Sequence, residues 1–99
     1  MKNVMVHFDF PNLTPQQYDA VWDGLKAAGH SHPKGLIFHV GATNPKGGFI
    51  VTDVWESSDA WQKFTQILLP LIQKNAPNVT TQPIVTETRY VYQPAEIHA

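Results

Sequence analysis

The stretch GLIFHVGATNPKGGFIVTDVWESSDAWQKF, residues 35–64, decides how this chain folds. Two runs rich in β-branched and aromatic residues, LIFHV (36–40) and FIVTDVWE (49–56), flank a turn sequence, and this pattern is typical of a β-hairpin. The segment Asn44-Pro45-Lys46-Gly47 suits a type I turn, with Asn at its first position and Pro at its second. Because Gly47 can adopt the left-handed conformation, we expect a three-residue hairpin loop over residues 45–47.

Each strand of this hairpin carries one titratable side chain in its middle, His39 in the first strand and Asp53 in the second. If residues 45–47 form the loop, counting outward places His39 directly opposite Asp53, and Ile37 opposite Trp55. Directly opposed side chains share a face with Cβ atoms about 4.5–5.5 Å apart, so a buried pair would select one tautomer of the imidazole. A loop one residue longer or shorter would instead turn the two side chains to opposite faces.

A strand and a helix are expected before the hairpin. Apolar residues at every second position predict a strand over residues 4–10. Thr14 is suited to cap a helix, Pro15 to its first position, and Gln17 to complete a capping box. Gly29 follows the last residue at helical spacing and is a plausible end of this helix.

A second helix and a last strand are expected after the hairpin. Ser57 or Ser58 can cap the helix, whose apolar residues recur at helical spacing. Pro70 should kink this helix or end its regular part, because its ring opposes a carbonyl of the preceding turn. The segment from 79 to 92 reads as the last strand, interrupted near Pro83.

The element order βαββαβ predicts an α+β fold. Right-handed crossovers make a ferredoxin-like arrangement the most economical topology, with a four-stranded antiparallel sheet and both helices on one of its faces. At 99 residues the whole chain, 1–99, is expected to form a single domain.

Neither face of the strand over residues 49–56 is polar. Its alternate residues are Phe49, Val51 and Trp55 on one face, and Ile50 and Val54 on the other. Because the two helices can cover only one face, the opposite face needs a second cover. Two such sheets packed face to face would provide it, so we expect a homodimer.

The composition excludes several classes of partner and chemistry. The chain is 42% hydrophobic and 15% charged, with a formal net charge of −1 and no basic run, so nucleic acid is not an expected partner. No apolar run reaches the roughly 20 residues that span a bilayer, and no membrane partner is expected. The absence of cysteine excludes disulfides, thiolate catalysis and cysteine-bound zinc. A cytoplasmic location is the default expectation.

The chain resembles the dimeric α+β barrel superfamily, which includes the antibiotic-biosynthesis monooxygenase-like proteins. The resemblance lies in Phe38-His39-Val40, in Gly47-Gly48, in the run VTDVWES over 51–57, and in an aromatic-rich helix ending in Leu69-Pro70. It implies a dimer with a small apolar pocket between helices and sheet. The superfamily includes monooxygenases, isomerases, cyclases and haem-degrading enzymes, so it constrains architecture more than chemistry.

The candidate site residues follow from the hairpin and its neighbours. His39 and Asp53 are the catalytic candidates, because a neutral histidine held by a carboxylate can act as a general base. The candidates for ligand binding are Trp55, His7, Trp61 and Phe64. His7 lies on one face of the first strand and would line either the pocket or the dimer interface, and for Trp61 the sequence favours a place in the core.

Two functions are compatible with these residues. The first is binding of a small apolar or aromatic ligand without a bound metal or other cofactor, and its conversion by a cofactor-independent monooxygenase or isomerase acting on an aromatic or polyketide-like substrate. The second is a non-catalytic, ligand-binding or stress-related dimeric module whose cavity is only core. A pocket of a few hundred Å³ reached by His39 would favour the first.

Overall fold

A computed structural model of the chain describes residues 2–92 and confirms the predicted βαββαβ order. Its elements are β1 (Val4–Phe10), α1 (Pro15–Ala27), β2 (Leu36–Thr43), β3 (Phe49–Trp55), α2 (Ser58–Asn75) and β4 (Ile84–Glu87).

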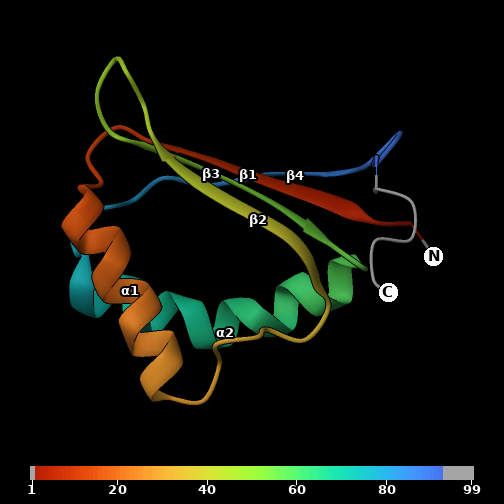
Figure 1. Cartoon of the computed structure of the whole chain (residues 1–99), viewed down its shortest axis with the longest axis horizontal. Helices are drawn as coiled ribbons and strands as arrows, with labels where there is room; N and C mark the ends of the chain where they lie inside the picture. The colour runs from red at the N-terminus through yellow and green to blue at the C-terminus, as the bar shows by residue number, and fades with distance from the viewer. Residues whose placement is uncertain (1, 93–99) are drawn as a thin grey trace, which may run out of the picture.

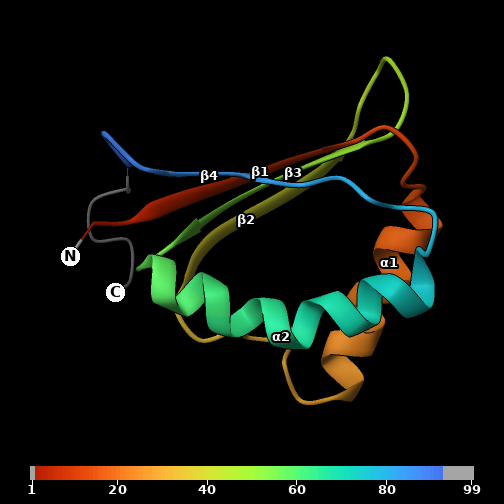
Figure 2. The ribbon, with the colours of Figure 1, turned by 180° about the vertical axis from the view of Figure 1, so that it is seen from behind.

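The four strands form one sheet in the order β2-β3-β1-β4, and all neighbours are antiparallel. Both helices lie on the same side of this sheet, and α1 lies at the C-terminal half of α2, steeply inclined to it (Figure 1, Figure 2). The ferredoxin-like α+β arrangement expected from the sequence is therefore confirmed.

The first helix begins as its sequence predicts. The Thr14 hydroxyl accepts from the Gln17 backbone N–H at 3.1 Å, and the Gln17 side chain accepts from the Thr14 N–H at 3.1 Å. Together these two bonds form a complete capping box. Gly29, with φ of 86°, follows the last turn in the left-handed region that favours glycine.

The second helix extends past Pro70, where one of the two predictions had its regular part end. Ser57 is its N-cap, and its hydroxyl accepts from the Ala60 N–H at 3.1 Å. Pro70 does not end the helix, which continues to Asn75. The proline removes one backbone donor in the interior, but packing of the helix against the core holds the remaining turn.

The last strand is shorter than predicted. The segment 79–92 was expected to be a strand, but only Ile84–Glu87 pairs, with β1 from Val4 to His7. Pro83 stands directly before the strand and has no N–H to donate to a ladder. One further backbone bond, from Thr88 N–H to the Asn3 carbonyl at 3.0 Å, extends the pairing beyond the strand.

The hairpin has the predicted loop, and His39 lies opposite Asp53 as expected. The Gly47 N–H donates to the Asn44 carbonyl at 2.9 Å, and Gly47 has φ of 111°. The expectation that Ile37 faces Trp55 was wrong. The register shifts between Leu36 and Phe38, so that Leu36 pairs with Trp55 instead. The intervening residue is the extra residue of a β-bulge, which simple counting does not foresee.

The core lies between the sheet and the helices. Val6 and Trp55 are fully buried, and Leu25 from α1 is 1% exposed. Among the described residues, Asp53 is the only buried polar one, with 6% exposure. The core therefore contains one carboxylate, at the position opposite His39.

The outer face of the sheet, turned away from the helices, is rich in exposed apolar side chains. Strand alternation places Phe38 and Val40 of β2, Val54 of β3 and Ile84 of β4 on this face. Phe38 is 52% exposed and Ile84 is 60% exposed. This face has the apolar character that the sequence predicts on both sides of the sheet.

Thr14→Ala should lower the free energy of unfolding by about 0.5–2 kcal/mol, because it removes the side-chain acceptor of the capping box. The measurement is urea denaturation followed by circular dichroism. Thr14→Ser keeps the acceptor and is the control. Equal stability of Thr14→Ala and the parent protein would show that the box does not hold the helix start.

Candidate functional site

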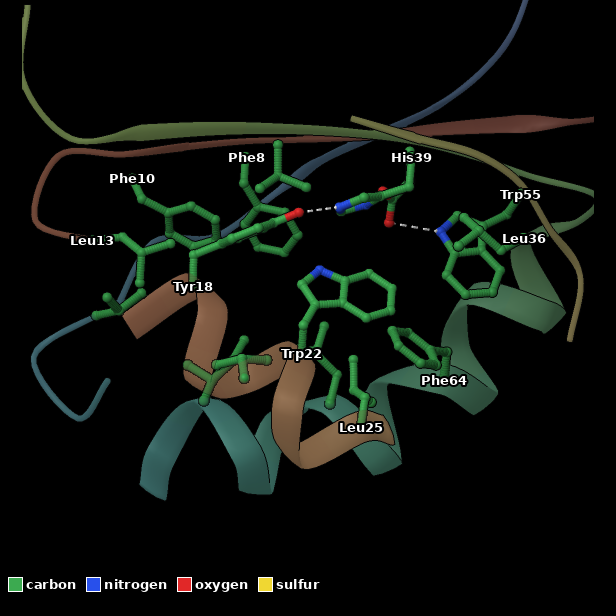
Figure 3. Close-up of a pocket in the computed structure, with 16 residues that line it drawn as sticks. Phe8, Phe10, Leu13, Tyr18, Trp22, Leu25, Leu36, His39, Trp55 and Phe64 are labelled. Carbon is green, nitrogen blue, oxygen red and sulfur yellow. Dashed lines mark hydrogen bonds and ion pairs between the residues drawn. The ribbon is translucent and has the colours of Figure 1, made fainter. Parts of the chain in front are cut away.

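A cavity of about 70 Å³ lies between the sheet and the two helices (Figure 3). Most of the side chains around it are aliphatic or aromatic. Three polar side chains also line it, namely Tyr18 from α1, His39 from β2 and Asp53 from β3. The arrangement is a largely apolar, aromatic cavity with one cluster of polar groups.

His39 and Asp53 form a close pair in this cavity. The distance from His39 Nδ1 to Asp53 Oδ1 is 2.6 Å, and the histidine side chain is 20% exposed. The other carboxylate oxygen, Oδ2, accepts from the Trp55 indole N–H at 3.1 Å. Each oxygen of the buried carboxylate therefore has a donor, as a charge removed from water requires.

These contacts assign the tautomer of His39. An ionised carboxylate only accepts hydrogen bonds, so Nδ1 must carry the proton that it receives. In the neutral ring Nε2 is then the acceptor, and it lies 2.6 Å from the Tyr18 hydroxyl oxygen. The tyrosine accordingly donates to Nε2 (Figure 3), which is the nitrogen with which His39 could accept a proton.

Two aromatic side chains of α1 lie against the imidazole. Tyr18 and Trp22 are four residues apart and so share one face of the helix. The Trp22 ring meets the His39 ring edge-on, with centroids 5.0 Å apart and an interplanar angle of 69°. The Tyr18 ring is nearly parallel to the imidazole, at 9° and 6.0 Å. Together they close the helix side of the site.

Burial raises the pKa of the Tyr18 phenol above its ordinary value, and the negative charges of Asp53 and Asp19 raise it further. The phenol therefore stays protonated at neutral pH. This agrees with its role as the donor to His39 Nε2.

The structure brings together four of the six predicted site residues. His39, Asp53, Trp55 and Phe64 all line the cavity. Trp61 is buried but does not line the cavity, and its ring packs against Trp55 with centroids 5.8 Å apart.

His7 lies on the outer face, where its Nδ1 is 2.9 Å from the Thr52 hydroxyl oxygen. The alternation of β1 explains this, because Val6 and Phe8 take the inward positions on either side of it. His7 therefore does not line the cavity, and its place in a dimer interface stays a prediction.

Tyr18 and Trp22 line the site but were not among the six predicted site residues. Their spacing of four residues predicted a shared face, and that was the available signal. It could not tell that this face crosses β2 at the level of His39, because the position of a helix over a sheet depends on packing distant in sequence.

Known proteins with a similar fold were found among solved structures only. No protein-family model matches the sequence, and no curated protein sequence matches it either. Solved structures do match. A variant of SnoaB, described as a cofactor-independent oxygenase from Streptomyces nogalater, is similar with a TM-score of 0.69 at 17% identity, over 92% of this chain and 97% of that chain.

A protein of unknown function from Nitrosomonas europaea is similar with a TM-score of 0.60 and 17% identity, over 95% of this chain and 94% of its own. A candidate antibiotic biosynthesis monooxygenase from Chloroflexus aurantiacus has a TM-score of 0.58 and 20% identity, over 92% and 95% of the two chains. This chain has the fold of the antibiotic-biosynthesis monooxygenase-like proteins.

Two further properties concern the part of the chain that the structure describes. Within residues 2–92, neither helix has the length and apolar character that crossing a bilayer requires. In the same residues no three His, Asp or Glu side chains gather in a way that could hold a metal ion.

The raised pKa of Tyr18 predicts a loss of stability at alkaline pH. Because the unfolded chain releases this proton at lower pH than the folded chain, the free energy of unfolding should fall as pH rises through about 10. Tyr18→Phe removes the group, so its stability should decline less between about pH 9 and 11. Chemical denaturation across this range measures the slopes.

Tyr90→Phe is the matched control, because it removes a hydroxyl from a ring that is 80% exposed. It should keep the slope of the parent protein. Identical slopes for Tyr18→Phe and the parent would contradict a partly buried phenol with a raised pKa at this site.

Proposed function

We propose that this protein binds a small aromatic or polyketide-like molecule in the cavity and that His39 removes a proton from it. The observation that carries the proposal is the orientation of one imidazole. Asp53 holds Nδ1 at 2.6 Å, which makes Nε2 the basic nitrogen, and the partner of Nε2 in this structure is the Tyr18 hydroxyl at the same cavity. A histidine in this arrangement is suited to general base catalysis.

The residues around His39 have separate roles in this reaction. Nε2 accepts a proton from an acidic C–H or O–H group of the ligand, and the Asp53 carboxylate stabilises the imidazolium that forms. Trp55 holds the second carboxylate oxygen, which keeps the acceptor in place. The surrounding aromatic rings limit the contact of this site with water, which strengthens the interaction of the imidazolium with the ligand anion.

Two outcomes can follow this proton transfer. In an oxygenase the ligand carbanion reacts directly with dioxygen, which is a second substrate and accepts its electrons. In an isomerase the proton returns from Nε2 to a different ligand atom. The likeness to SnoaB, described as a cofactor-independent oxygenase, supports the first of these.

The volume of the cavity favours the second candidate function, a non-catalytic dimeric module whose cavity is only core. About 70 Å³ is well below the roughly 300–1,000 Å³ of typical ligand pockets. A drug-sized molecule can bind here only if side chains move. A protein whose cavity stays closed would use the same polar cluster as a structural feature of its core.

The outer face supports a homodimer. Exposed Phe38 and Ile84 belong to two different strands of this face. A hollow of about 600 Å³ lies between such strand residues and the segment 88–92. Exposed apolar side chains gathered on one face are typical of a protein–protein interface, and a second copy of the sheet would cover them.

His39→Gln should lower the rate of proton abstraction by about 10²–10⁴-fold, because glutamine has no basic nitrogen. The measurement is deuterium exchange at the acidic carbons of β-tetralone in heavy water, followed by NMR. His7→Gln is the matched control, since His7 lies on the outer face and hydrogen-bonds Thr52. Equal exchange rates in His39→Gln and the parent protein would reject His39 as the base and favour the non-catalytic module.

Phe38→Lys should convert the protein from dimer to monomer in sedimentation at micromolar concentration, because it places a charge in the proposed interface. Leu69→Lys is the matched control, since Leu69 is 53% exposed on α2 and Phe38 is 52% exposed on the outer face. If the parent protein itself sediments as a monomer, the dimer does not exist.

A further inference from the structure

The hydroxyl of Tyr18 is hydrogen-bonded to His39 Nε2, the nitrogen that must accept the ligand proton in the proposed reaction. It lies 2.6 Å from His39 Nε2 and donates to it. While this bond exists, no ligand proton can reach the same lone pair. The structure is therefore that of a site whose base is covered by a side chain of the protein itself.

The tyrosine ring occupies a place shaped to receive it. Its centroid lies 4.5 Å from that of Phe49, on one side of the site. A Cβ atom at Gly41 would lie 2.6 Å from the phenol oxygen and 2.7 Å from Cζ, closer than real contacts allow. Gly41 does not have a positive φ, so its backbone does not require glycine. The space that the phenol needs is the reason for glycine at this position.

The same side chain also limits the volume of the site. Tyr18 and Trp22 are partly exposed, so they stand at the edge of the cavity and not in its interior. Rotation of the Tyr18 side chain toward solvent would free Nε2 and add the volume of a phenol ring to the cavity. Both changes are needed before an aromatic ligand can bind, and one movement supplies both.

We propose that Tyr18 determines specificity as an internal stand-in for the ligand, and that the ligand is a planar hydroxyaromatic molecule. Its hydroxyl replaces the tyrosine hydroxyl on His39 Nε2, and its ring takes the place beside Phe49 and above Gly41. This deepens the proposed function and rests on it, because both use the same nitrogen. The exchange of one phenol for another breaks one hydrogen bond and forms an equivalent one. The site is therefore expected to prefer ligands that resemble the Tyr18 phenol.

The raised pKa of Tyr18 supports this role. A phenol that stays protonated is a hydrogen-bond donor and a poor base, so the tyrosine covers Nε2 without taking protons from the ligand. A ligand phenol more acidic than Tyr18 would donate more strongly to Nε2 and displace it.

The test measures binding of para-nitrophenol and para-nitroanisole to the full chain by calorimetry. Tyr18→Phe should bind para-nitrophenol about two- to tenfold more tightly than the parent protein, because the competing neutral hydrogen bond is gone. Affinity for para-nitroanisole, which has no hydroxyl to donate, should not rise. Gly41→Ala should weaken para-nitrophenol binding, since its methyl group would fill the place that both phenols use.

Circular dichroism shows that each variant is folded before its affinity is compared. Weaker or equal binding of para-nitrophenol by Tyr18→Phe would overturn the proposal, because the tyrosine would then assist the ligand or be irrelevant to it. Absence of binding to both proteins, or equal gains for the two probes, would overturn it as well. The exchange of β-tetralone protons tests His39 separately, so rejection of the stand-in leaves that result standing.

Discussion

The buried carboxylate of Asp53 is the constraint on which the rest of the site depends. An ionised group removed from water costs several kcal/mol unless donors replace its hydration. In this fold the donors are the imidazole of His39 and the indole of Trp55. The carboxylate thus requires the edge strand β2 to pair with β3 in one register, and it requires Trp55 to keep its buried rotamer.

The polar cluster connects the sheet to the first helix through a single further bond. Asp53 selects the tautomer of His39, the tautomer makes Nε2 an acceptor, and Nε2 binds the hydroxyl of Tyr18. Each hydrogen bond thus determines whether the next group in the chain acts as donor or acceptor. The position of α1 over β2 is therefore determined partly by hydrogen bonding and partly by the apolar contacts of Leu25 in the core.

The sequence predicted those features that depend on local chemistry. The capping box of Thr14 and the loop ending at Gly47 each follow from residues within a few positions, and the loop then set the pairing of His39 with Asp53. The predicted pairing of Ile37 with Trp55 was wrong because a bulge lies before Phe38. The extra residue of a bulge on an edge strand cannot be recognised from the alternation of apolar residues. The place of Tyr18 depends on how a helix crosses a strand, which no local pattern contains.

The small cavity and the covered base have a common cause. A site that holds an unpaired imidazole nitrogen and an empty aromatic cavity would expose a polar group to a dry, poorly packed space, and both cost free energy. Tyr18 lowers both costs by covering the edge of the cavity with its ring and by donating its hydroxyl to Nε2. A closed ground state is thus what folding favours when Nε2 has no ligand. Opening of the site requires only that the hydrogen bond from the Tyr18 hydroxyl to Nε2 breaks. A ligand phenol can replace this neutral hydrogen bond at little cost in free energy.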